Sequence, residues 1–74
     1  MFDKKSIDLA KWVIVDELSK QPMNYMQILL AAEKFFGEQR TIPVMFALDH
    51  LVYVGAVSDN LSVFPAQYSL NTKF

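Results

Sequence analysis

At 74 residues the chain is long enough for one small domain, and its 7 basic and 8 acidic side chains leave a formal net charge of −1. This balance lacks the basic surplus with which a free-standing DNA-binding domain neutralises phosphates. The absence of cysteine excludes disulfides and thiolate metal sites, and the single His50 cannot form a zinc site alone.

The first predicted helix covers about residues 6–19 and ends before Pro22. Its apolar residues recur at helical spacing, and we expect them to form a core stripe: Ile7, Ala10, Ile14 and Leu18. Trp12 lies away from this stripe. We expect a later hairpin to cover the Trp12 ring, and the alternative is that the ring belongs to an interface.

The second predicted helix has the clearest start signal in the chain. Asn24 is a favourable N-cap, and Gln27 three residues later completes a capping-box-like pair. Met23 and Ile28 occupy the two positions of a hydrophobic staple. Gly37 is the expected C-terminal cap.

The third predicted helix covers about residues 43–54, with Pro43 at its first position and Gly55 at its end. At about 100° per residue, one side is apolar and is expected to be core: Val44, Ala47, Leu48, Leu51 and Val52. The opposite side presents Phe46, Asp49, His50 and Tyr53.

Two short strands are expected after this helix. Ala56–Val57 and residues 61–64 favour strands, with a turn at residues 58–60 between them. The tail, residues 65–74, has weaker signals. Tyr68 and Leu70 are compatible with a docked edge strand.

Three helices followed by a small hairpin predict one domain over residues 1–74, α+β in class and mainly α. The order is that of a winged helix-turn-helix fold, with its core in about residues 6–64. A plain three-helix bundle with a frayed tail is the structural alternative.

The outward side of the third helix decides between classes of function. A helix that reads DNA needs Arg, Lys, Asn or Gln to meet base edges and phosphates, and this side has none. Its two aromatic rings with neighbouring polar groups are typical of a protein-interaction surface. The alternative is that Phe46 or Tyr53 folds back against the hairpin or the tail.

Nothing in the sequence indicates an active site, a cofactor or a metal. Asp49 and His50 are neighbours but point about 100° apart on a helix, so they do not form a catalytic dyad. Apolar residues reach 53% of the chain, which fits either a dense core or an interface. No apolar run is long enough for a signal peptide or a transmembrane helix, so we expect a cytoplasmic protein without membrane contact.

Residues 42–57 resemble the third helix and first wing strand of the small middle components of bacterial ABC-three-component systems. The matching residues are Phe46, Ala47, Leu48, Asp49, Leu51, Tyr53, Gly55 and Val57. The first helix and the tail have no such match. The resemblance implies a non-enzymatic winged-helix adaptor that links an ABC- or SMC-like ATPase to an effector in a defence-type complex.

The sequence therefore predicts a protein-interaction module. The resemblance implies an ATPase as its partner, and a second copy of the chain is the alternative. Its contact residues are Phe46, Asp49, His50 and Tyr53, with Trp12 as a second patch. One alternative is a small homodimeric DNA-binding regulator that contacts phosphates through Lys4, Lys5, Lys34 and Arg40. Another is a phage- or plasmid-encoded inhibitor of a host protein, which would use the same contact residues.

Overall fold

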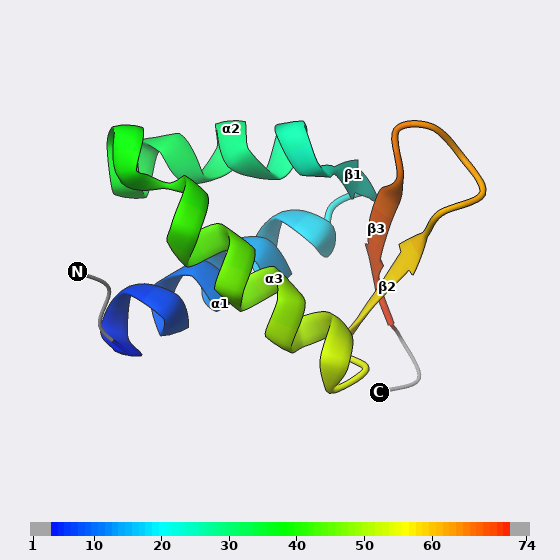
Figure 1. Ribbon diagram of the computed structural model, residues 1–74, viewed down its shortest axis with the longest axis horizontal. Coiled ribbons are helices and arrows are strands. Elements are labelled where there is room, and N and C mark those ends of the chain that lie inside the picture. Colours follow the sequence, from blue (N-terminus) through cyan, green and yellow to red (C-terminus); the bar gives the residue numbers. More distant parts are fainter. Residues whose placement is uncertain (1–3, 72–74) are drawn as a thin grey trace.

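The computed structural model describes residues 4–71, which form three α-helices, a short 3-10 turn and a three-stranded antiparallel sheet. In chain order these are α1 (Lys4–Leu18), β1 (Met23–Asn24), α2 (Tyr25–Phe36), η1 (Gly37–Gln39), α3 (Thr41–Tyr53), β2 (Val57–Asn60) and β3 (Gln67–Leu70). In Figure 1, α3 crosses in front of α1, α2 lies above them, and the sheet stands at the right-hand end. The predicted α+β, mainly α architecture is confirmed, and the sheet excludes a plain three-helix bundle. Within residues 4–71 no helix has the length and apolar content needed to cross a bilayer.

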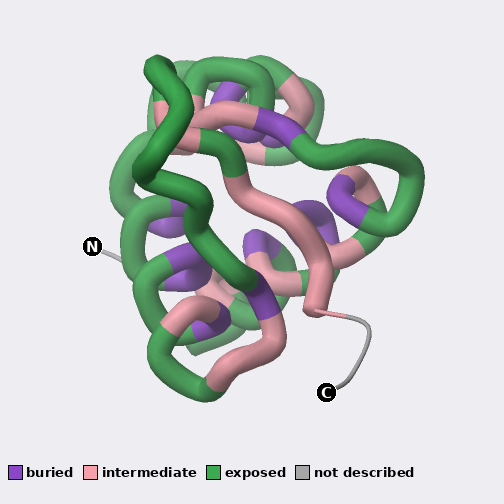
Figure 2. Tube along the Cα trace, turned by 90° about the vertical axis from the view of Figure 1, so that its right-hand side faces the viewer, coloured by how far each residue is buried: buried purple, intermediate pink, exposed green. Residues whose placement is uncertain are grey.

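The hydrophobic core forms where the three helices and the sheet meet, and α1 and α3 make the most extensive contact. The predicted stripes lie there: Ala10, Ile14 and Leu18 of α1 and Val44, Ala47, Leu48 and Leu51 of α3 are buried. Ile7 and Val52 are partly buried and pack against this cluster. Figure 2 shows the buried positions on the inward sides of the helices.

The start of α2 is fixed by the capping box that the sequence predicts. The Gln27 backbone N–H donates to the Asn24 side-chain oxygen Oδ1 at 2.9 Å, and the Asn24 backbone N–H donates to Oε1 of Gln27 at 2.9 Å. Met23 and Ile28, the two staple residues, are both buried in the core cluster. At the other end Gly37 caps the helix with a φ of 60°, a conformation that favours glycine.

Asn24→Ala is expected to lower the free energy of unfolding by about 0.5–2 kcal/mol, because one helix N–H loses its acceptor. Asn24→Ser is the matched control, since serine is also a favourable N-cap and should recover most of the loss. Urea denaturation followed by circular dichroism measures both variants. Equal stability of Asn24→Ala and the wild type would contradict this role for the cap.

The predicted hairpin is wrong in its strand positions. Residues 58–60, expected as the turn, belong to strand β2, and residues 61–64, expected as the second strand, lie in the exposed β2–β3 loop. Leu61, Val63 and Phe64 suit a strand by propensity, but a strand forms where its side chains gain burial and a paired neighbour. Phe64 is fully exposed in the loop, whereas Tyr68 and Leu70 of β3 pack against the core.

The tail forms the centre of the sheet, where an edge strand was expected. The strand order is β1-β3-β2, with Met23 opposite Tyr68 and Val57 opposite Leu70. The Asn71 backbone N–H then donates to the Ala56 carbonyl at 2.9 Å. The core therefore extends beyond the predicted limit of residue 64, because β3 closes it. Residues 72–74 of the predicted tail lie outside the described residues.

Candidate interaction surface

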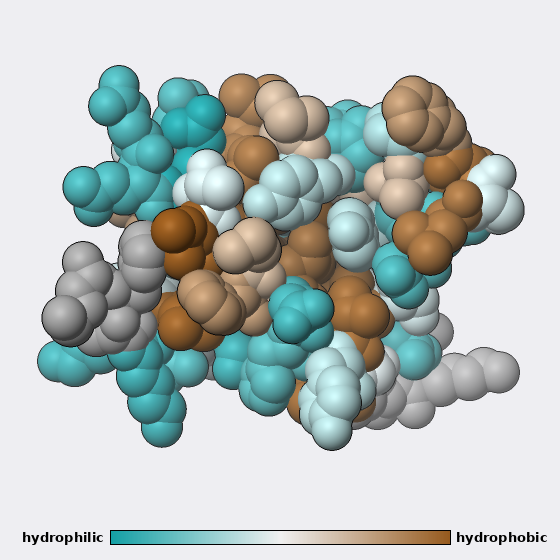
Figure 3. All heavy atoms as spheres, in the orientation of Figure 1, coloured by the Kyte–Doolittle hydropathy of each residue, from teal (hydrophilic) through white to brown (hydrophobic). Residues whose placement is uncertain are grey.

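The outward side of α3 presents the four residues that the sequence singles out, and we call Phe46, Asp49, His50 and Tyr53 the α3 outer face. All four side chains are exposed. The exposed fraction is 87% for Tyr53, so its ring does not fold back against the hairpin or the tail, and it is 51% for Phe46, whose ring is about half-covered. Figure 3 shows this side of the molecule, where hydrophobic and hydrophilic side chains are mixed over α3.

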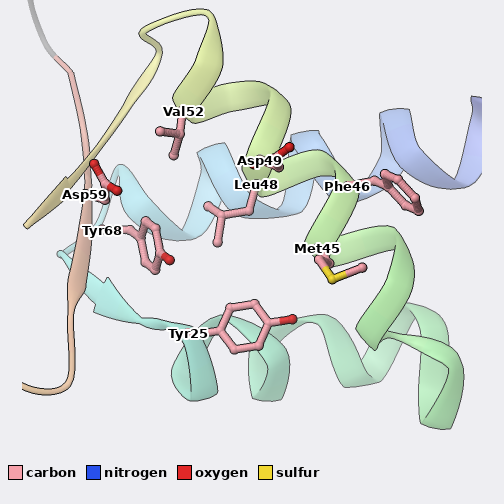
Figure 4. Close-up of a pocket in the computed structure, with 8 residues that line it drawn as sticks. All are labelled: Tyr25, Met45, Phe46, Leu48, Asp49, Val52, Asp59 and Tyr68. Carbon is pink, nitrogen blue, oxygen red and sulfur yellow. The ribbon is translucent and has the colours of Figure 1, made fainter. Parts of the chain in front are cut away.

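A hollow of about 640 Å³ lies between the start of α2, α3 and the sheet, and we call it the α3–sheet hollow. Its lining residues are Tyr25, Met45, Phe46, Leu48, Asp49, Val52, Asp59 and Tyr68. In Figure 4, Tyr25, Leu48 and Tyr68 point into a common space from α2, α3 and β3. Phe46 projects from α3 at one margin, and Asp59 lies on β2 at the opposite side. The hollow therefore adjoins the α3 outer face and shares Phe46 and Asp49 with it.

The electrostatic character of the hollow is acidic. Its charged lining residues are Asp49 and Asp59, and none of the described residues that line it is Lys, Arg or His. Burial is the largest cause of the raised pKa of Tyr68. Electrostatic interaction with Asp59, and after it with Tyr25, raises this pKa further. Tyr68 therefore stays a neutral phenol well above neutral pH. The hollow combines an apolar lining with two carboxylates, those of Asp49 and Asp59.

Asp59→Asn is expected to move the pKa of Tyr68 part of the way back toward the usual value near 10. Because the pKa of Tyr68 is higher in the folded state than in the unfolded chain, there is a pH range in which folded Tyr68 is still protonated and unfolded Tyr68 is ionised. The contribution of Tyr68 to stability is therefore complete below about pH 10 and is lost as the pH rises through the folded-state pKa. Spectrophotometric titration of tyrosinate measures the shift, and a difference titration against Tyr68→Phe assigns it.

Asp49→Asn is the control for this titration, because Asp49 is not among the groups that raise the pKa of Tyr68. It should leave the Tyr68 titration unchanged. An unchanged Tyr68 titration in Asp59→Asn would contradict the assigned role of the Asp59 charge.

Trp12 is exposed, so the expectation that a hairpin covers its ring is wrong. Its exposed fraction is 74%. Ile14, two positions further along α1, is fully buried, and two residues at about 100° each place Trp12 nearly opposite it. The ring lines a second shallow depression of about 360 Å³ with Asp8, Lys11 and Val15, which shares no residue with the α3–sheet hollow.

Of the basic residues considered as phosphate contacts, three lie outside α3, and Arg40 is the N-cap residue of α3. Lys4 and Lys5 belong to the first turn of α1, and Lys34 belongs to the last turn of α2. Figure 1 places both turns at the end of the molecule away from the sheet. Arg40 is engaged within the chain, since its Nη1 donates to the Gly37 carbonyl at 2.9 Å and lies 3.8 Å from Oε2 of Glu33.

Comparison with known proteins gives no relative. No protein-family model, curated protein or solved structure matches this chain. Among residues 4–71, no three His, Asp or Glu side chains are grouped so that they could hold a metal ion.

Sequence reasoning found the α3 outer face but missed most of the hollow beside it. Tyr25, Asp59 and Tyr68 come from elements that meet only because β3 pairs with β1 and β2. The local pattern contains no signal for that pairing. Of the lining residues on α3, the helical spacing places Phe46 and Asp49 on the outward side and Leu48 and Val52 on the core side, whereas the sequence analysis assigns Met45 to neither side.

Proposed function

We propose that the chain is a non-enzymatic winged-helix module that binds another protein through the α3 outer face. The element order, with β1 paired to the hairpin strand β3, supports the assignment to a winged helix-turn-helix domain. In DNA-binding domains of this type the corresponding helix enters the major groove. The observation that supports protein binding is the composition of this face, two exposed aromatic rings with an aspartate and a histidine.

Phosphate binding through α3 is disfavoured by its charges. The helix from Thr41 to Tyr53 contains no Lys or Arg, and Asp49 on its outer face would repel a phosphate backbone. Asp59 adds a second negative charge on the neighbouring strand. Exposed Phe and Tyr side chains gain free energy when a partner removes them from water, and aromatic residues are enriched at the centre of protein interfaces.

The resemblance to ABC-three-component middle components supplies the partner class, an ABC- or SMC-like ATPase that the module links to an effector. Apart from Gly55, whose φ of 87° favours glycine, the matching residues divide into two groups. Packing explains the buried ones, which are Ala47, Leu48, Leu51 and Val57. Core packing does not explain the exposed matches at Phe46, Asp49 and Tyr53, and a shared binding role is the explanation we propose for them.

Affinity co-purification from native cells tests this proposal. The N-terminally tagged protein is recovered at moderate salt after nuclease treatment, and bound proteins are identified by mass spectrometry. We expect an ATPase in stoichiometric amount that resists the nuclease. Recovery of the chain alone, or only with DNA that the nuclease removes, would overturn the proposal in favour of the DNA-binding regulator. A stoichiometric partner of another kind would retain the interaction module and overturn the ATPase assignment.

A further inference from the structure

We propose that the α3–sheet hollow receives a partner segment in which an apolar side chain is flanked by Lys or Arg. This inference rests on the proposed function and specifies the chemistry of its partner. The occupant is a segment of another protein, and a second copy of this chain is one of the outcomes that the experiment separates.

The shape and lining of the hollow suit an apolar side chain. Its volume of about 640 Å³ lies within the range of ligand-binding clefts, roughly 300–1,000 Å³. Leu48 and Val52 of α3 and the rings of Tyr25 and Tyr68 supply apolar surface from three elements (Figure 4). An inserted aromatic or large aliphatic side chain would exchange water for these contacts.

The two carboxylates of the hollow require a positively charged partner segment. Asp49 comes from α3 and Asp59 from β2, so they stand on different elements of one hollow. In the part of the chain that the structure describes, the ion pairs join Lys20 or Arg40 to other acidic residues. Asp49 and Asp59 take part in none of these pairs and so remain available to a partner.

Occupation by a neutral segment would be costly. A carboxylate that loses water without gaining a partner is destabilised strongly, and the effect grows as the surroundings become less polar. The negative charge of Asp59 raises the pKa of the Tyr68 phenol, so its electrostatic effect extends into the hollow. Lys or Arg residues that flank the inserted apolar side chain would compensate the two carboxylates, whereas an acidic segment or a nucleic-acid backbone adds repulsion.

Selection from a display library of short random peptides on the purified, full-length chain tests the inference. We expect the enriched peptides to place Lys or Arg next to an aromatic or large aliphatic residue. A synthetic copy of an enriched peptide should bind about 10- to 100-fold more weakly to Asp49→Asn/Asp59→Asn, since a hydrogen bond to a charged group contributes roughly 1.5–3 kcal/mol. Its affinity should also fall as salt is added.

The matched control is Asp8→Asn/Glu38→Gln, which removes the same net charge from exposed positions outside the hollow. Asp8 lines the depression beside Trp12, so this control also detects peptides that bind there. Enrichment of acidic or uncharged peptides, no enrichment, or an equal loss in both double variants would overturn the inference. Dimerisation of the free chain that Asp49→Asn/Asp59→Asn abolishes would also overturn it, because the occupant would then be a second copy.

The co-purified partner separates failure of this inference from failure of the proposed function. If Phe46→Glu/Tyr53→Glu no longer binds that partner but Asp49→Asn/Asp59→Asn still does, the proposed protein-interaction function is retained. The inference that the partner segment is basic is then wrong. If both double variants retain the partner, the α3 outer face is not the contact and both proposals fail. Loss of the partner in both variants, with unchanged melting temperatures, supports both.

Discussion

Phe46→Glu/Tyr53→Glu is expected to weaken partner binding at least about 30-fold while the domain stays folded. Both side chains are largely exposed, so neither holds the core together. Truncating a central aromatic side chain of an interface costs about 2 kcal/mol or more, and an introduced carboxylate adds desolvation to that loss. Isothermal titration calorimetry with the co-purified partner measures the affinity, and urea denaturation should give a stability within about 0.5 kcal/mol of the wild type.

Leu61→Glu/Phe64→Glu is the matched control for this pair. It places the same two charges on exposed apolar residues of the β2–β3 loop, where Figure 3 also shows hydrophobic side chains gathered at the upper right. We expect this control to bind as the wild type does. Unfolding of Phe46→Glu/Tyr53→Glu would place these rings in the core, and equal losses in both variants would show that added negative charge alone weakens binding.

Ile14→Ala is expected to lower the free energy of unfolding by about 2–5 kcal/mol, the largest stability effect among the variants considered. Ile14 is fully buried on α1, which packs most extensively against α3. A domain of this size has a total stability of only roughly 4–11 kcal/mol, so the variant should be partly unfolded at moderate temperature. Leu9→Ala on the same helix is the control, because Leu9 is exposed and should lose much less. A smaller loss for Ile14→Ala than for Leu9→Ala in urea denaturation would contradict the core assignment.

The helices could be predicted because their signals are local, although the expected start of the third helix is wrong: α3 begins at Thr41, so Pro43 is its third residue and not its first. The start of α2 is defined by Asn24 and Gln27, and its end by Gly37. Each of these residues makes its capping contact with a residue only a few positions away in the chain. The inward and outward sides of α3 also follow from spacing alone, and the structure places the predicted core and outer residues on the expected sides. A helix that packs on one side keeps its periodicity in the sequence.

The sheet could not be predicted because its pairing is long-range. β1 has two residues, one of which is the N-cap Asn24, and it becomes a strand only by pairing with Gln67 and Tyr68. The apolar residues of the β2–β3 loop gave a stronger local strand signal than β3 itself. The exposure of Trp12 has a related cause, since the strands expected to cover its ring form the sheet elsewhere in the fold.

Chemical-shift mapping by NMR, with the co-purified partner added to the labelled chain, tests the protein-binding role of α3 most directly. We predict that the largest changes occur in residues 45–53, on the outer side of α3, with smaller changes for Asp59 and Tyr68 across the hollow. The same experiment contradicts the account if α3 is unchanged and the changes fall on Lys4, Lys5 and the last turn of α2.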